Sequence, residues 1–124
     1  MRNLPLAGIQ VLIIEEEFLI ALDIGLIVEQ AGGKSLSFRT FEEARNAKAH
    51  WPDYRIAIVN PPDGSISEAE IAREMQDAGI RLVICTADTG TNLAKLGLAV
   101  APIVVKPFTA DDLLAACAAA LEVN

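Results

Sequence analysis

Chemically capable side chains stand at the ends of several apolar runs in this sequence. They are three consecutive carboxylates, an amide, a hydroxyl and an ammonium, carried by Glu15–Glu17, Asn60, Thr86 and Lys106. A lysine beside carboxylates forms charge-assisted hydrogen bonds that hold a polar pocket in one geometry, and a carboxylate is also a nucleophile. The glutamates fit a second interpretation, a solvated helix start, because the helix dipole favours acids there. The sequence contains no Cys/His cluster, Gly-rich phosphate loop or nucleophile elbow.

The elements that position these side chains alternate between strand and helix. Apolar runs predict strands at 9–14, 34–38, 56–59, 80–85 and 101–105. Helices are expected between and after them, at 18–31, 41–50, 65–78, 91–96 and 109–122. This alternation predicts a doubly wound α/β fold, with a parallel sheet covered by helices on both faces. Sites in such sheets lie at the carboxyl ends of the strands, where the polar groups stand.

Two helices carry further local signals. Leu19, Leu22 and Leu26 form an apolar stripe on the first helix. Thr109, followed three residues later by Asp112, is close to a capping box at the start of the last helix. These signals support the predicted positions of both helices.

Composition limits the class of protein. The chain has 124 residues, 52% of them hydrophobic, which predicts one folded domain over 1–124 and excludes intrinsic disorder. Ten basic against seventeen acidic residues give a net charge of −7, which argues against nucleic acid and anionic membranes as partners. No apolar run reaches the roughly 18 residues of a membrane span, and the N-terminus resembles no signal peptide, so a cytoplasmic protein is expected. Cys85 and Cys117 are expected in the core.

The strand ends resemble a known family. The segment 11–21, VLIIEEEFLIA, looks like the opening of a two-component response-regulator receiver domain. The segment 84–87, ICTA, resembles the hydroxyl-bearing end of that family's fourth strand, and 104–108, VVKPF, resembles its lysine–proline turn. The resemblance covers the whole chain and implies a CheY-like, flavodoxin-like (βα)5 fold with strand order 2-1-3-4-5.

The resemblance also implies a chemistry. In the family, an aspartate on the third strand accepts a phosphoryl group from a histidine kinase, and two acids after the first strand hold Mg²⁺. Glu15 and Glu16 match the acidic pair, while Thr86 and Lys106 match the residues that contact the phosphoryl oxygens. Pro107 matches the family's proline, whose preceding bond is usually cis. Glutamate is longer than aspartate and Mg²⁺ demands near-octahedral geometry, so only weak Mg²⁺ binding and no other cofactor are expected.

The phosphoacceptor position departs from the family. The third strand runs into Asn60, and an amide cannot be the nucleophile that forms an acyl phosphate. A second alignment, through Pro62-Asp63-Gly64, places Ile58 at the acceptor position instead. Asn60 is preferred, because the second alignment puts Arg55 inside a strand that should be buried on both faces. Neither alignment supplies an aspartate.

The switch position departs as well, and together the departures predict a degenerate receiver, or pseudo-receiver. Three residues before the lysine, where the family usually has Tyr or Phe, this chain has Ile103. The expected function is a stand-alone, non-enzymatic signalling module without an output domain. Its expected partners are a histidine kinase, a phosphotransfer protein or another regulator, or a second copy. The face formed by 91–96, 101–105 and 109–122 is the predicted contact surface.

Two other functions stay open. A working phospho-receiver would use Asp63 or Glu16 as the acceptor, with Mg²⁺. A small ligand-binding or enzymatic domain would use the same crevice, although the sequence offers no paired nucleophile and base.

Overall fold

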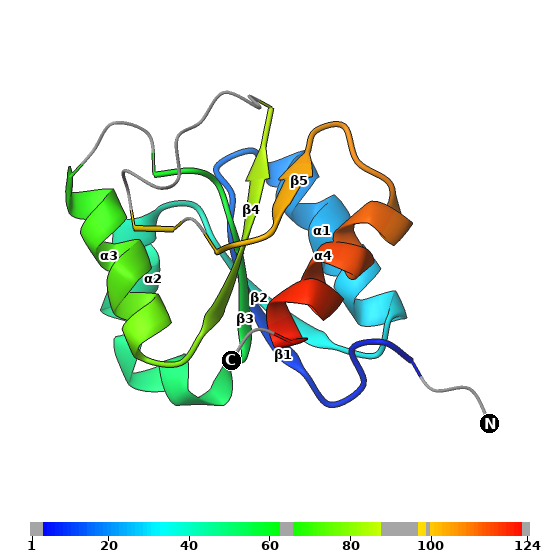
Figure 1. Cartoon of the computed structure of the whole chain (residues 1–124), viewed down its shortest axis with the longest axis horizontal. Helices are drawn as coiled ribbons and strands as arrows, with labels where there is room; N and C mark the ends of the chain where they lie inside the picture. Colours follow the sequence, from blue (N-terminus) through cyan, green and yellow to red (C-terminus); the bar gives the residue numbers. More distant parts are fainter. Residues whose placement is uncertain (1–3, 63–65, 88–96, 99, 123–124) are drawn as a thin grey trace.

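The computed structural model describes residues 4–62, 66–87, 97–98 and 100–122, and these form an α/β fold around one parallel sheet (Figure 1). The strands are β1 (Gln10–Ile14), β2 (Lys34–Phe38), β3 (Ile56–Val59), β4 (Arg81–Thr86) and β5 (Ile103–Val105). The helices are α1 (Phe18–Gln30), α2 (Phe41–Asn46), α3 (Ile66–Asp77) and α4 (Ala110–Glu122), with a 3-10 helix, η1, at Lys48–Asp53. The strand order β2-β1-β3-β4-β5 confirms the predicted flavodoxin-like fold.

The register of the strands brings their carboxyl ends to one edge of the sheet. Ile14 pairs with both Phe38 and Val59. The backbone pairing continues for one residue beyond the ends of β1 and β3. The N–H of Glu15 donates to the carbonyl of Phe38, and the N–H of Asn60 donates to the carbonyl of Ile14. The polar groups at the ends of β1 and β3 therefore lie at the same level.

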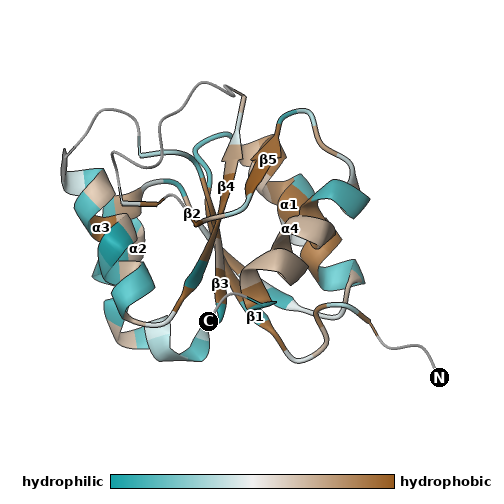
Figure 2. Ribbon diagram, in the orientation of Figure 1, coloured by the Kyte–Doolittle hydropathy of each residue, from teal (hydrophilic) through white to brown (hydrophobic). Residues whose placement is uncertain are grey.

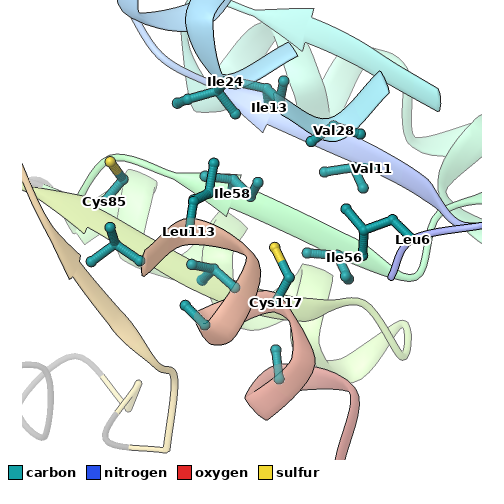
Figure 3. Packing of buried hydrophobic residues seen from close by; sticks show 14 of the residues in the cluster. Leu6, Val11, Ile13, Ile24, Val28, Ile56, Ile58, Cys85, Leu113 and Cys117 are labelled. Atoms are coloured by element: carbon teal, nitrogen blue, oxygen red, sulfur yellow. The ribbon is translucent and has the colours of Figure 1, made fainter. Parts of the chain in front are cut away.

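The sheet separates two hydrophobic layers. One cluster lies between the sheet and helices α1 and α4, and includes Ile13, Ile58, Cys85 and Cys117 (Figure 3). The other lies beneath α2 and α3 on the opposite face. Burial raises the pKa of each cysteine thiol to about 11, so both stay protonated at neutral pH. Figure 2 shows that the central strands of the sheet, which separate the two layers, consist largely of hydrophobic residues.

The stripe on the first helix does not face this core. Leu22 and Leu26 are each 49% exposed and Leu19 is 75% exposed, whereas Ile24 and Val28 are buried against the sheet. Because α1 is apolar on both sides, its periodicity could not show which side faces the sheet.

Two other elements differ from the prediction. The helix expected at 41–50 ends at Asn46, and the chain continues as η1, which contains Trp51 and Pro52. Burial of the indole explains the break, since Trp51 packs under α2 and its Nε1 donates to the carbonyl of Ala44 at 3.0 Å. Strand β5 begins at Ile103 and not at 101. The helix expected at 91–96 lies outside the described residues.

Within the described ranges, every helix is too short or too polar to traverse a lipid bilayer.

Candidate functional site

A buried ion pair joins the ends of β1 and β5. The Nζ of Lys106 lies 2.6 Å from Oε1 of Glu15, and the Glu15 side chain is only 2% exposed, against 20% for Lys106. The backbone of Glu15 is held by its bond to β2, and that of Lys106 by donation to the carbonyl of Thr86. The sheet therefore fixes both ends of the pair, although 91 residues separate them in the sequence.

Asn60 completes the cluster from the end of β3. Its Nδ2 donates to Oε2 of Glu15 at 3.2 Å, and its Oδ1 accepts from Nζ of Lys106 at 3.3 Å. An amide can serve both partners because it presents a donor and an acceptor. Oε2 of Glu15 also accepts the N–H of Glu17 at 3.0 Å. We refer to Glu15, Asn60 and Lys106 below as the polar triad.

Glu15 is ionised in this environment. Burial raises its pKa, but hydrogen bonds from Lys106, the Glu17 N–H and Asn60, together with the charge of Lys106, lower it by more. The resulting pKa lies below the ordinary value of 4.5. Donors to the charged form are therefore strong enough here to outweigh desolvation.

A cavity of about 440 Å³ opens beside the polar triad. Asn60, Lys106, the buried Thr86 and the exposed Glu16 line it, so it gathers four of the side chains singled out in the sequence. Glu15 lies beneath this cavity, bound to two of its lining residues.

Sequence reasoning missed Arg39 and Thr40, which line the same cavity. Both directly follow β2, so the strand-end signal that indicated the other residues would have found them. Thr40 also has a structural role, since its hydroxyl caps α2 by accepting the N–H of Glu43 at 3.1 Å.

The remaining predicted positions lie elsewhere. Ile58 is fully buried in the core, so Asn60 and not Ile58 contacts Lys106. Ile103 is 47% exposed on β5, the edge strand of the sheet. The Lys106–Pro107 peptide bond is cis. Asp63 lies outside the described residues.

The donor set does not fit Mg²⁺. Both oxygens of Glu15 are engaged by the triad and the Glu17 N–H, and the carbonyl oxygen of Asn60 faces an ammonium group. No cluster of three or more acidic, histidine or cysteine side chains placed to hold a metal occurs in the part of the chain that the structure describes. Mg²⁺ requires several oxygen ligands in near-octahedral geometry, which this arrangement does not supply.

Comparisons with solved structures define the class of fold. A response regulator from Thermotoga maritima superposes with a TM-score of 0.79 at 15% identity, over 94% of this chain and 99% of that one. SdrG from Pseudomonas melonis Fr1, solved in a BeF3-activated conformation, matches with a TM-score of 0.72 at 25% identity, over 98% and 99% of the two chains. PhyR from Bartonella quintana, described as an anti-anti-sigma factor, matches at 30% identity and a TM-score of 0.66.

The PhyR match covers 90% of this chain but only 46% of PhyR. No family model and no curated protein matches the sequence. The chain thus has the fold of response-regulator receivers, and its structural neighbours include signalling proteins of that class.

Proposed function

We propose that this chain is a receiver-like module of two-component signalling that is not phosphorylated in the usual way. Asn60 stands at the phosphoacceptor position, and the module acts through contacts with other proteins. The pocket is held in one state, so signal enters through binding or abundance.

The observation that carries this proposal is the partner of Lys106. In a receiver, the corresponding lysine pairs with the phosphoryl oxygens. Here it pairs with Glu15 at 2.6 Å and also donates to Asn60. The ammonium group of Lys106 is therefore already neutralised, and Asn60, at the end of β3, supplies no nucleophilic carboxylate.

The comparisons support protein contact as the output. PhyR is described as an anti-anti-sigma factor, a designation that refers to action on another protein.

Intact-protein mass spectrometry after incubation with acetyl phosphate and Mg²⁺ tests the proposal. The wild-type chain is expected to gain no phosphoryl group, while Asn60→Asp gains one, because the substitution supplies the carboxylate nucleophile. Asn46→Asp is the matched control, since Asn46 is exposed on α2 and its carboxylate should stay unmodified. A competent receiver reacting alongside shows that the phosphodonor is active.

Two outcomes would overturn the proposal. A phosphoryl group on the wild-type chain, mapped to Asp63 or Glu16, would instead establish the phospho-receiver. If Asn60→Asp proves inert, the double variant Asn60→Asp with Glu16→Asp is tested next, because aspartate at position 16 shortens the acidic side chain that lines the cavity. If this folded double variant neither reacts nor binds beryllofluoride, Asn60 does not occupy the acceptor position.

A further inference from the structure

The amino half of β4 has no strand beside it on the β5 side. β4 begins at Arg81, but the register pairs Ile84 with Ile103, the first residue of β5. Pro102 explains the late start, because the residue before Ile103 would have to donate an N–H to β4 and proline has none. In Figure 1, β4 accordingly extends below the start of β5. A short stretch of strand edge is therefore left open.

The open edge presents one peptide donor and one peptide acceptor, both of which belong to Leu82. The N–H of Arg81 donates to the carbonyl of Arg55 on the β3 side. The N–H of Ile84 donates to the carbonyl of Pro102 on the β5 side. Because backbone groups alternate in direction along a strand, the N–H and C=O of Leu82 point to the β5 side. Among the described residues neither group has a hydrogen-bond partner, although Leu82 is only 3% exposed.

A cavity lies where these two groups point. Roughly nine in ten buried backbone groups in native proteins are hydrogen-bonded, because a bond left unmade costs the full desolvation of the group. The cavity has a volume of about 240 Å³, and Leu82 lines it together with Gln76 of α3 and Ala120 of α4. It lies at the amino-terminal edge of the sheet, opposite the polar triad. The peptide groups of Leu82 therefore have space in which to meet a ligand.

Arg81 brings a positive charge to the same cavity. Its side chain takes part in none of the ion pairs formed within the described ranges. A guanidinium group beside a free peptide N–H suits a carboxylate, since both can donate to the same anion. The other lining residues are mostly apolar and include Ile80, Val100 and Pro102. The cavity thus combines an anion-binding end with an apolar wall.

We propose that this cavity binds a small N-acylated amino acid with an apolar side chain. Its amide N–H donates to the carbonyl of Leu82, and its carboxylate accepts the N–H of Leu82 and pairs with Arg81. The ligand pairs with Leu82 as one residue of an antiparallel strand would. The cavity is smaller than the roughly 300–1,000 Å³ of sites for drug-sized molecules, so it suits a ligand of this size. The site is separate from the polar triad and does not depend on the proposed function.

N-acetyl-leucine is the probe, and amide chemical shifts of the isotope-labelled protein report where it binds. Shift changes are expected at 76–82, 100, 101 and 120. The Leu82 amide proton should move downfield, because it gains an acceptor. The changes should saturate with a Kd of about 1 mM or tighter, as expected for a ligand of about twelve heavy atoms.

Two related ligands test the polar groups one at a time. N-acetyl-leucinamide lacks the carboxylate, and N-acetyl-N-methyl-leucine lacks the amide N–H. Each should bind at least about tenfold more weakly than N-acetyl-leucine, since each loses a hydrogen bond to a buried group.

Variants make the test specific. Arg81→Met should abolish the preference for the carboxylate over the carboxamide, which a purely structural arginine would leave unchanged. Arg45→Met is the matched control, since Arg45 is exposed on α2 and pairs with Glu74. Pro102→Ala should weaken binding of N-acetyl-leucine, because alanine supplies an N–H that competes for the carbonyl of Leu82. Circular dichroism checks that each variant is folded.

Three results would overturn the proposal. They are no saturable shift change up to about 10 mM ligand, changes centred on the polar triad, or equal affinity for all three ligands. A peptide of about six residues that ends in leucine and binds more than tenfold tighter would assign the same chemistry to a protein's carboxyl terminus. Phosphorylation of the wild-type chain would overturn only the proposed pocket state, so the two failures are distinguishable.

Discussion

Replacing Lys106 by Met tests whether the polar triad is held by its ion pair. The substitution keeps most of the volume of the side chain and removes the cation that lies 2.6 Å from Glu15. Glu15 stays nearly fully buried, and its remaining donors are the Glu17 N–H and Asn60. The native state then contains a buried carboxylate without a counter-charge.

The expected loss follows from the burial of the two partners. Breaking a fully buried pair costs about 3–5 kcal/mol. Lys106 is one-fifth exposed and Glu15 keeps two donors, so a loss of about 2–3 kcal/mol is expected. For a domain of this size, that corresponds to a decrease in Tm of about 10 °C.

The loss should depend on pH in a defined direction. The folded-state pKa of Glu15 is lowered, so its stabilising contribution is present above the ordinary value of 4.5 and lost as pH falls through the folded pKa. Without Lys106, burial still raises that pKa, while two of the opposing causes, the hydrogen bond from Lys106 and its charge, are gone. The wild type and Lys106→Met should therefore differ most near neutral pH and converge in acid, where Glu15 is protonated in both.

Urea denaturation followed by circular dichroism measures these differences. Circular dichroism is preferred to fluorescence because Lys48, which the control removes, lies 5.6 Å from the ring centre of Trp51. The control is Lys48→Met, whose exposed pair with Glu74 should contribute less than about 1 kcal/mol. In a double-mutant cycle with Glu15→Gln, the two losses should be non-additive. The reasoning fails if Lys106→Met costs no more than Lys48→Met, or if its cost persists unchanged in acid.

Two further predictions concern the framework around the site. Thr109→Ala should destabilise the protein by about 1 kcal/mol, because the Thr109 hydroxyl accepts the N–H of Asp112 at the start of α4. In thermal melts Thr109→Ser should keep most of this stability, whereas equal Tm values for the wild type and both variants would contradict a capping role. Trp51→Phe should cost about 2 kcal/mol in urea denaturation, because the buried side chain becomes smaller and the carbonyl of Ala44 keeps only the N–H of Ala47 as a donor. A loss below about 0.5 kcal/mol would show that the buried indole does not hold η1.

The fold was largely predictable because its signals are local. The runs that became β1 and β3 are apolar apart from Gln10 at the start of β1, as expected for strands with helices on both faces, and their ends were placed within one residue. The capping box at Thr109 is present, with Asp112 accepting the N–H of Thr109 in return. The strand order came from the family resemblance and not from periodicity.

The features that the sequence did not predict depend on tertiary contacts. The sequence indicates that Glu15 and Lys106 lie at one sheet edge, but not that they pair while Glu16 stays exposed on the cavity wall. The end of α2 depends on burial of Trp51, which no local pattern shows. The orientation of α1 was equally hidden, because apolar residues such as Leu22 and Ile24 occur on both of its sides.

The charge balance of the pocket explains why Asn60 and the ion pair belong together. With an amide at the end of β3, one ammonium group can neutralise the single buried carboxylate, and the amide bridges the two. An aspartate at position 60 would place a second carboxylate against the same lysine, and one of the two acids would lose its counter-charge. In this chain the amide of Asn60 adds no charge, so Lys106 remains bound to Glu15.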